Sequence, residues 1–449
     1  MGGKHMTKYA NQIGVKVPEL LLPCAKVDMS RWAVVACDQY TSQPDYWNET
    51  ERLAGDAPSA LRIMLPEIYL DKPDEAARIE SINAHMKQYM QEGVLENKGE
   101  GFAYVRRTVD GKTRQGLIVA LDLEAYDYSK GSTTLIRATE GTIVERIPPR
   151  LRIRKDAPLE MPHILVLIDD PGRTVIEPIG SALEKTAKLY DFDLMQKGGH
   201  ITGYLVNDPG QIQSVIDALA ALIEPQAYAK KYGTDQPPLL FAMGDGNHSF
   251  ATAKANWERI KAEEGLTAQD EHPARYALVE LENVHDAGII FEPIHRVLFN
   301  VPENAICWLE EKLVEQNGGC EKLTFDSMEA LHAALAGKPG HALPCVSHFG
   351  IGCLYVPHPA AQLEVGTLQN ALDELLKAFP ACSIDYIHGE DVVHELGAKP
   401  GNLGFLLPPM DKNAFFRTVI FDGALPRKTF SMGEANEKRY YLECRCISR

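Results

Sequence analysis

Apolar runs that end abruptly in polar, glycine-containing turns are the clearest pattern in this chain. The sharpest example is the run Leu239–Met243, which stops at Gly244-Asp245-Gly246-Asn247. Beyond that turn, apolar residues from Phe250 to Ile260 recur at spacings of three and four, the period of an amphipathic helix. Residues 237–260 therefore predict a buried strand, a tight turn and a helix.

A second segment near the N-terminus repeats this order of elements. The apolar residues Val34–Cys37 predict a short strand that ends at Asp38, and a helix is expected from about Pro44. Thr41 or Ser42 is expected to cap that helix, because hydroxyl side chains satisfy free backbone N–H groups at helix starts. Both segments thus place an acidic residue between a strand and a helix.

The rest of the chain alternates between helical and extended patterns. Asp110-Gly111 lies between two alternating segments and is a hairpin signal. The expected helices are 73–93, 209–231, 303–316, 327–337 and 367–378, and the expected strands are 102–107, 115–122, 163–168, 286–291, 293–298, 414–421 and a β pair in 344–357.

This mixture predicts an α+β fold in more than one domain. A length of 449 residues suggests about two or three domains. We expect an α/β core domain over 6–300, a smaller α+β domain over 301–410, and a C-terminal segment, 411–449, that returns to the core. Residues 1–5 have the character of an expression scar and carry no fold information.

Composition narrows the classes of partner. The formal net charge of −16 disfavours nucleic acid and anionic membranes as partners, because both require clustered Lys and Arg. No apolar run is long enough to span a bilayer, and no secretory signal is present at the N-terminus. Nine cysteines without a CxxC pair favour free thiols and a cytoplasmic location. A small anionic ligand in a local pocket and a homo-oligomer both remain compatible with the sequence.

The turn before residue 250 has the chemistry of an anion site. The first N–H groups of a helix lack partners, and the helix dipole adds about half a positive charge there. Asp245 and His248 are ionisable at this turn, and Gly246, Asn247 and Ser249 complete it. The alternative is a purely structural connection, since Asp, Asn and Ser are common at helix starts. Four polar side chains in five residues exceed what a cap requires.

Two further groups of residues are candidates for the same site. Asp38 is a candidate general base or metal ligand, because ligands bind at the ends of strands in open α/β sheets. A basic and polar cluster suits phosphate or carboxylate recognition, since arginine forks bind both. A solvated cap and a salt-bridged loop are the structural alternatives for these two groups. The cluster consists of Arg137, Thr139, Glu140, Arg146 and Arg150.

Several familiar sites are disfavoured by the sequence. Cys345, His348, Cys353 and His358 have zinc-like spacing, but the residues around Gly350 fit a β-hairpin better. The GKT triplet at 111–113 lacks the upstream glycine of a phosphate-binding P-loop, and no GxGxxG, GxSxG or HExxH motif occurs.

Five segments resemble a bacterial protein family, domain of unknown function 1015. They are CDQYTSQPDYW (37–47), RATEGTIVERIPPR (137–150), GDGNHS (244–249), IDYIHGEDVV (384–393) and ALPRKTF (424–430). The GDGNHS elbow is also similar to the D-G-H-H-R motif of ParB-like and sulfiredoxin-like folds, which include free serine kinases. The resemblance implies a ParB/sulfiredoxin-like nucleotide- or phosphate-binding core. Family members are often encoded near serine-biosynthesis genes, which directs the expectation toward serine or phosphoserine.

The chain departs from that motif at two positions. Asn247 replaces the first histidine and Ser249 replaces the arginine. Loss of arginine removes a fixed positive charge and a bidentate phosphate contact. Either Arg146, Arg150 or another cation supplies the missing charge, or the ligand is less anionic than a polyphosphate.

These observations lead to one main functional hypothesis and two alternatives. The main one is a phosphotransferase-like enzyme acting on serine or phosphoserine, with Mg²⁺ and a nucleotide or pyrophosphate as expected cofactors. Asp38 is then the base, His248 a phosphate contact or acid/base, and Asp245 a Mg²⁺ ligand or the residue that orients His248. The alternatives are a metal-dependent phosphatase using the same three residues and a non-catalytic sensor of nucleotides or phosphorylated metabolites.

Overall fold

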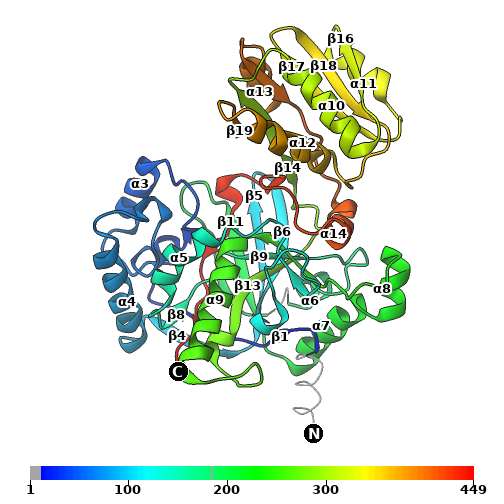
Figure 1. Ribbon diagram of the computed structural model, residues 1–449. Helices are drawn as coiled ribbons and strands as arrows, with labels where there is room; N and C mark the ends of the chain where they lie inside the picture. Colours follow the sequence, from blue (N-terminus) through cyan, green and yellow to red (C-terminus); the bar gives the residue numbers. More distant parts are fainter. Residues whose placement is uncertain (1–11, 184–185) are drawn as a thin grey trace. The chain divides into compact units, whose positions relative to one another are not determined.

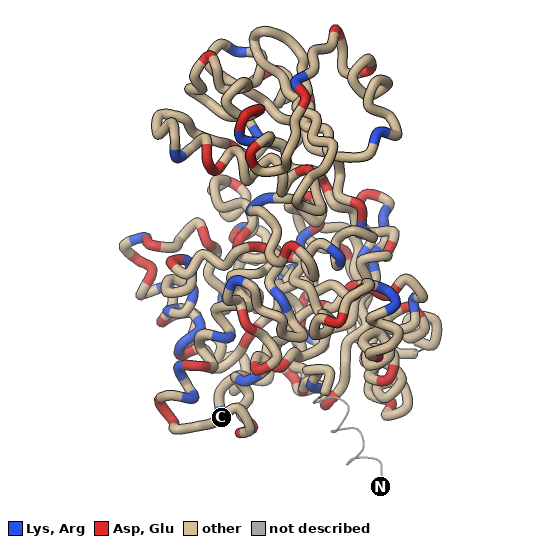
Figure 2. Tube along the Cα trace, turned by 45° about the vertical axis from the view of Figure 1, so that its right-hand side comes forward, with Lys and Arg blue, Asp and Glu red and all other residues tan. Residues whose placement is uncertain are grey.

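The computed structural model describes residues 12–183 and 186–449, which form two units. The first comprises the chain up to Ile290 together with Met432–Arg449, and the second is Phe291–Ser431. Residues 1–5, the expected expression scar, lie outside the described residues. Figure 2 shows acidic and basic residues interspersed along the trace of both units.

A nine-stranded mixed sheet organises the first unit (Figure 1). Its order is β10-β11-β5-β6-β13-β9-β12-β7, and β1 pairs with β6. Most pairs are antiparallel, but β13 runs parallel to β9 and β12 runs parallel to β7. The strands are β1 (Val15–Lys16), β5 (Phe102–Val109), β6 (Lys112–Asp122), β7 (Ile136–Arg137), β9 (Leu165–Ile168), β10 (Lys188–Asp193), β11 (His200–Val206), β12 (Phe241–Asp245) and β13 (Tyr276–Asn283).

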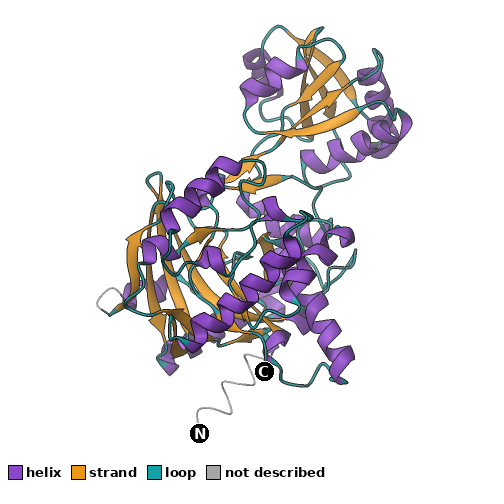
Figure 3. Ribbon diagram, turned by 90° about the vertical axis from the view of Figure 1, so that its left-hand side faces the viewer, coloured by secondary structure: helices purple, strands orange, loops and turns teal. Residues whose placement is uncertain are grey.

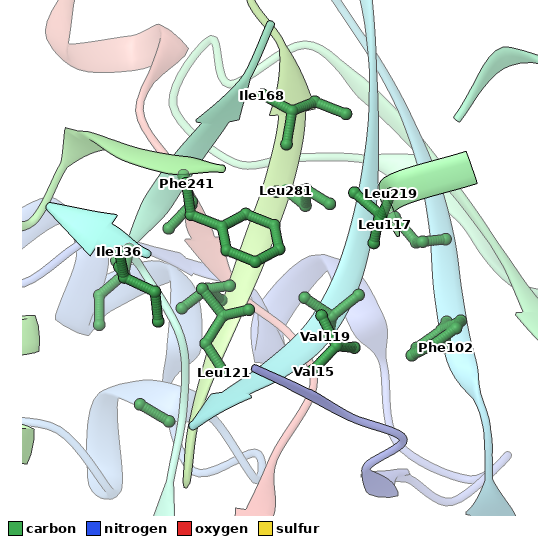
Figure 4. Close-up of a cluster of buried hydrophobic side chains, with 14 of the residues drawn as sticks. Val15, Phe102, Leu117, Val119, Leu121, Ile136, Ile168, Leu219, Phe241 and Leu281 are labelled. Atoms are coloured by element: carbon green, nitrogen blue, oxygen red, sulfur yellow. The ribbon is translucent and has the colours of Figure 1, made fainter. Parts of the chain in front are cut away.

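Both faces of this sheet are covered, because successive side chains of a strand point to opposite sides. In β5, Phe102 and Tyr104 belong to one hydrophobic core, while Ala103 and Val105 belong to another. Figure 4 shows part of the first core, with Phe241 of β12 among its labelled side chains. A segment buried on both faces reads as a continuous apolar run, which explains the pattern of Leu239–Met243.

Helices lie alongside the strands of the first unit, as Figure 3 shows. They are α2 (Met29–Trp32), α3 (Pro44–Ala54), α4 (Glu75–Gln91), α5 (Ile147–Arg154), α6 (Glu177–Leu183), α7 (Pro209–Leu222), α8 (Pro225–Tyr232) and α9 (Asn247–Glu264), with short 3₁₀ turns η1 (Ala60–Arg62), η2 (Glu67–Tyr69), η3 (Leu123–Ala125), η4 (Val144–Arg146), η5 (Pro273–Arg275) and η6 (Ala435–Glu437).

Three two-stranded pairs complete the first unit. The pair β3·β22 joins the N-terminal region to the C-terminal segment. The pairs are β2 (Glu19–Pro23) with β4 (Leu95–Glu100), β3 (Val34–Val35) with β22 (Tyr440–Tyr441), and β8 (Leu159–Glu160) with β23 (Arg445–Cys446).

A six-stranded antiparallel sheet, in the order β16-β18-β17-β20-β15-β19, forms the second unit. Its main hydrophobic core includes buried leucines of α10 and α12. The elements are β14 (Phe291–Pro293), β15 (His295–Phe299), β16 (Glu321–Phe325), β17 (His341–Ser347), β18 (Gly350–Val356), β19 (Ser383–Ile387), β20 (Asn402–Phe405), β21 (Phe430–Met432), α10 (Ala305–Asn317), α11 (Met328–Leu335), α12 (Glu364–Ala378), α13 (Glu390–Gly397) and α14 (Lys412–Phe421).

The α+β class is confirmed, but the units divide at other residues than expected. β15 lies between β20 and β19 in the second sheet, so this unit starts before residue 301. The chain returns to the first unit at Met432 rather than at 411. The returning strand β22 pairs with β3, and β23 pairs with β8. In both pairs the two strands are more than 280 residues apart in the sequence.

Several local predictions are corrected by the structure. Residues 414–421 form a helix, α14, whose Asp411 side chain caps it by accepting the Asn413 N–H. The expected helix 209–231 is broken into α7 and α8 before Pro225, which occupies the first turn of α8. The α3 helix starts at Pro44 with Gln43 as its N-cap and no side-chain cap bond, so neither Thr41 nor Ser42 caps it.

Candidate functional site

The strand β12, a left-handed Gly246 and the helix α9 form the elbow at the centre of the candidate site. Gly246 has φ +81° and is the N-cap of α9, with no side chain capping the helix. An added Cβ at Gly246 would lie 3.1 Å from a side-chain atom of Ile164. The first bond within α9 runs from Phe250 N–H to the Gly246 carbonyl. The three preceding N–H groups, from Asn247 to Ser249, therefore lie ahead of the helical ladder.

Asn247 ties the elbow to the neighbouring loop, because β7 runs parallel to β12 and both strands end at the same edge of the sheet. Its Oδ1 accepts a hydrogen bond from Thr139 N–H at 3.0 Å. The Thr139 hydroxyl in turn donates to the Met243 carbonyl at 2.6 Å. Thr139 and Asn247, which the sequence predicted as ligand-binding residues, are both buried, and their side chains stabilise the conformation of the elbow.

His248 is held as a neutral ring. Burial lowers its pKa to about 4, helped by the positive charges of Arg146 and Arg150 and opposed by Asp38. Its Nε2 accepts the Ile143 N–H at 3.2 Å. A neutral imidazole that accepts at Nε2 carries its proton on Nδ1, so His248 offers a hydrogen-bond donor.

Asp245 forms an ion pair with a residue from the C-terminal segment. Its Oδ2 lies 3.0 Å from Lys438 Nζ, and its Oδ1 accepts the Gly246 N–H at 2.8 Å. Burial raises the pKa of Asp245, but Lys438, His163 and the Gly246 N–H outweigh it and leave the pKa below its ordinary value. Asp245 is therefore an ionised carboxylate that faces a lysine.

Asp38 lies in the same electrostatic environment as His248. The Asp38 charge raises the pKa of both His248 and Glu67, and the Glu67 N–H donates to the carbonyl of Cys37, the residue before Asp38. Glu67 is paired with Arg150 at 2.5 Å, and both side chains are largely buried. Burial raises the pKa of Glu67, and the Arg150 charge opposes that rise. The two sequence elbows are thus brought together at one place in the first unit.

Ser249 begins a chain of hydrogen bonds that the sequence did not suggest. Its Oγ lies 2.8 Å from His163 Nε2, and His163 Nδ1 lies 2.9 Å from the Tyr441 hydroxyl. The Tyr441 hydroxyl also accepts the Cys37 N–H at 3.3 Å. The chain links α9, the segment before β9 and strand β22.

The arginines of the predicted cluster have different surroundings. Arg137 is buried and donates to the carbonyls of Thr133, Thr134 and Pro237, so its guanidinium braces loops. Arg146 is exposed at the end of η4, and Arg150 lies on α5, which packs against α9. The structure thus brings Asp38, Asp245, His248, Ser249, Arg146 and Arg150 together, while Arg137 is engaged elsewhere. Glu140, which follows Thr139 in the sequence, is half-buried and is not free, because it also takes part in an interaction.

The donor set does not fit a metal centre held by the protein. Among residues 12–183 and 186–449 there is no group of three or more His, Cys, Asp or Glu side chains arranged to hold a metal ion. Asp245, the expected metal ligand, already faces Lys438 and the Gly246 N–H. Cys345 and Cys353, of the zinc-like spacing, lie opposite Gly352 and Pro344 in the hairpin β17·β18.

Four residues of the site were missed by sequence reasoning: Glu67, His163, Lys438 and Tyr441. Each lies far in sequence from the elbow and follows no recognisable motif. Lys438 and Tyr441 reach the site because β22 pairs with β3. The only sequence signal for them was the expectation that the C-terminal segment returns to the core domain. In the described part of the chain, no helix has the length and apolar character needed to cross a membrane.

Comparison with known proteins gives one family and several distant structural likenesses. The family model described as protein of unknown function (DUF1015) matches residues 21–373. Three of the five resemblance segments lie inside this range, and those at 384–393 and 424–430 lie beyond it. No curated protein matches the chain.

The solved structures are similar at low identity. A conserved hypothetical protein from Pyrococcus furiosus has 12% identity and a TM-score of 0.34, covering 72% of this chain and 90% of its own. A free serine kinase in complex with AMP has 10% identity and a TM-score of 0.37, covering 74% and 91%. C-terminally truncated SbnI from Staphylococcus aureus has 10% identity and a TM-score of 0.36, covering 74% and 85%.

Proposed function

The chain belongs to DUF1015, a family of proteins of unknown function, and we propose that it is a phosphotransferase-like enzyme acting on a small polar metabolite with a hydroxyl group. One observation carries this proposal. The uncapped N-terminus of α9 lies beside Asp38, Arg150 and the neutral ring of His248. Phosphoryl transfer requires little more than a phosphate cradle, cations and one base.

The phosphate cradle is formed by the first turn of α9. The N–H groups of Asn247 and His248 and the helix dipole favour an anion at this position. The Nδ1–H of His248 adds a donor, and because the pKa of this ring is about 4, the donor persists at neutral pH. His248 is thus proposed as a phosphate contact rather than as an acid/base, since Nε2 is occupied by Ile143 N–H.

The cations that replace the motif arginine come from neighbouring elements. Arg146 and Arg150 both lower the pKa of His248, so their charges act at the first turn of α9. Arg146 is exposed and available to an incoming ligand, while Arg150 is held by Glu67. Together they supply the charge that Ser249 lacks.

Asp38 is the proposed base for the acceptor hydroxyl. It is half-buried in the turn after β3, accepts a hydrogen bond from the Gln39 side chain at 3.0 Å, and its charge acts on His248. The proposed donor is a nucleotide or pyrophosphate, and the proposed acceptor is serine. The serine assignment rests on the similarity of the GDGNHS elbow to the elbow of free serine kinases.

The test is a direct search for O-phosphoserine. The full chain is incubated with serine and with ATP, ADP or pyrophosphate, and products are measured by mass spectrometry. Asp38→Asn is expected to slow product formation by about 10²- to 10⁴-fold, the usual effect of losing a general base. Asp45→Asn, exposed in the first turn of α3, is the matched control and is expected to retain activity.

Three results would contradict the proposal. Full turnover by an Asp245→Ala, His248→Ala double variant would remove the elbow from the mechanism. Release of phosphate from phosphoserine without a donor, lost on chelation, would favour a metal-dependent phosphatase. Tight nucleotide binding without turnover of any acceptor would favour a sensor.

A further inference from the structure

The hydrogen-bonded series Ser249–His163–Tyr441 lies at the same helix turn as the proposed phosphate cradle. Ser249 is the third residue of α9 and follows His248, whose backbone N–H belongs to the cradle. Ser249 and His163 are both half-buried. The proposed transfer to a metabolite by Asp38 uses none of these three residues.

The directions of the hydrogen bonds decide what the series can do. The Tyr441 hydroxyl oxygen accepts the Cys37 N–H at 3.3 Å, and the same hydroxyl lies 2.9 Å from His163 Nδ1. In the tautomer that carries its proton on Nδ1, His163 donates this proton to the Tyr441 oxygen.

The same tautomer gives His163 the orientation of a base toward Ser249. With its proton on Nδ1, the neutral ring presents the Nε2 lone pair to Ser249 Oγ at 2.8 Å. A serine hydroxyl bonded to an imidazole lone pair, with the other ring nitrogen oriented by a third group, is the arrangement of an activated nucleophile. The His163 and Tyr441 rings meet edge-on, with centroids 5.6 Å apart and planes at 85°.

We propose that Ser249 is a catalytic nucleophile that accepts a phosphoryl group, with His163 as its general base and Tyr441 as a positioning residue. The inference deepens the proposed function and rests on it, because it specifies that transfer passes through a phosphoserine enzyme. The phosphoryl source is a phosphoanhydride, either pyrophosphate or the terminal phosphate of a nucleotide.

The transfer has two halves, and each half breaks one P–O bond and forms another. Ser249 Oγ forms a bond to phosphorus, the bridging P–O bond of the anhydride breaks, and the leaving oxygen keeps its electron pair. The Ser249 proton moves to His163 Nε2. In the second half, the acceptor hydroxyl attacks phosphorus and gives its proton to Asp38, while Ser249 Oγ leaves with its electron pair and recovers the proton from His163. No oxidant or reductant takes part.

The charges around Ser249 fit this step. The free N–H groups of the first turn of α9 and the neighbouring arginines stabilise negative charge on the transferring phosphoryl group. The motif position that is arginine in the resembling kinases is serine here, so a phosphate contact has been exchanged for a nucleophile. This exchange accounts for the departure of GDGNHS from the kinase motif.

The experiment is a phosphoenzyme trap on the full chain. The protein is mixed with ³²P-pyrophosphate, or with ATP or ADP labelled in the terminal phosphate, then quenched in denaturant and mapped by mass spectrometry. We expect one phosphate on Ser249, stable in acid and labile in alkali as a phosphoserine is, and released when serine is added before the quench.

Variants separate the roles of the three residues. Ser249→Ala is expected to abolish the label, and His163→Gln to slow its appearance at least about 100-fold, within the range for loss of a general base. Tyr441→Phe is expected to slow labelling while leaving the affinity for pyrophosphate unchanged in calorimetry, since it acts only through His163. Ser214→Ala, an exposed serine of α7, is the control and is expected to label as the wild type does.

The outcomes distinguish this inference from the proposed function. Phosphoserine product without enzyme label, or label that persists in Ser249→Ala, overturns the nucleophile and leaves the phosphotransferase proposal standing. Label on Ser249 without transfer to any hydroxyl acceptor supports the nucleophile and overturns the transferase. Neither label nor product from any of the three donors overturns both. His163→Gln keeps the Ser249 hydroxyl and a polar side chain at position 163 but removes the imidazole. A wild-type labelling rate in that variant overturns the assignment of His163 as the general base.

Discussion

Arg439 connects the C-terminal segment to the large sheet, and its removal is the most demanding test of how the site is held together. Its guanidinium lies 2.6 Å from Glu280 on β13 and also pairs with Glu443. The side chains of all three residues are at most 1% exposed. Tyr190 donates to the second oxygen of Glu443. The same segment carries Lys438 and Tyr441 into the candidate site.

Arg439→Met keeps an unbranched apolar stem and removes the charged guanidinium. Two buried carboxylates then lose their cation, and breaking a buried pair by removing one partner costs about 3–5 kcal/mol. For a unit of this size, about 2–4 °C of Tm per kcal/mol gives a fall of at least about 6 °C. The control is Arg52→Met, whose pair with Glu49 is exposed and is expected to contribute about 0–1 kcal/mol.

Urea denaturation followed by tryptophan fluorescence measures this difference. The chain has four tryptophans, of which Trp308 is in the second unit, so a Trp308→Phe background confines the signal to the first unit. Burial raises the pKa of Glu280, but Arg439 leads the charges that bring it below the ordinary value of 4.5.

The sign of the pH dependence follows from that depressed pKa. A depressed carboxyl pKa gives stability that is present above pH 4.5 and is lost as the pH falls through the folded value, so the deficit of Arg439→Met is expected in full at pH 7 and to shrink in acid. Adding Glu280→Gln and Glu443→Gln to Arg439→Met is expected to recover part of the loss. An Arg439→Met variant no less stable than Arg52→Met would show that the buried cation does not stabilise the first unit.

Three further predictions concern the elbow. Gly246→Ala and Gly265→Ala both place a side chain at positive φ, at +81° and +68°, and each is expected to lower the free energy of unfolding by about 1–2 kcal/mol in urea denaturation. Only Gly246→Ala should weaken pyrophosphate binding. Equal losses of binding in the two variants would count against a phosphate site at the elbow. His248 has a pKa lowered to about 4 from its ordinary 6.5, so it contributes stability above pH 6.5 that is lost as the pH falls toward 4. His248→Gln should therefore flatten the decline of Tm between these pH values. Parallel curves of Tm against pH for the variant and the wild type would contradict the lowered pKa of His248. Because the charges at the site come from Arg146, Arg150 and Lys438, treatment with EDTA is expected to leave the calorimetric affinity for pyrophosphate unchanged, and a marked loss would point to a metal ion.

Local patterns in the sequence predict the parts of the fold that depend on local rules. The hairpin β5·β6 turns at Asp110 and Gly111, both at positive φ as the Asp-Gly signal requires. The elbow of β12 and α9 follows from an apolar run, a left-handed glycine and helical periodicity. These elements can be predicted from neighbouring residues alone, because they do not depend on tertiary contacts.

Tertiary contacts decide what the sequence could not predict. The aromatic and β-branched residues of 414–421 favour a strand, yet the Asp411 cap and burial of Phe415 and Phe416 stabilise a helix. His163 lies just before a strand, with nothing in its neighbours to mark it as a partner of Ser249. Long-range pairing of β22 with β3 is equally invisible in a single sequence, because its partners are separated by about 400 residues. An arginine's role also depends on its surroundings, as the loop-bracing Arg137 shows.

Calorimetric titration of pyrophosphate tests most directly whether the first turn of α9 binds phosphate. The wild type is compared with an Arg146→Gln, His248→Ala double variant, and with an Arg106→Gln, His332→Ala double variant as control, whose residues are exposed on β5 and α11. We predict binding to the wild type and to the control with equal affinity, and binding at least about tenfold weaker, or about 1.4 kcal/mol, in the site variant. Equal affinity of all three proteins, or no binding to the wild type, would contradict the account.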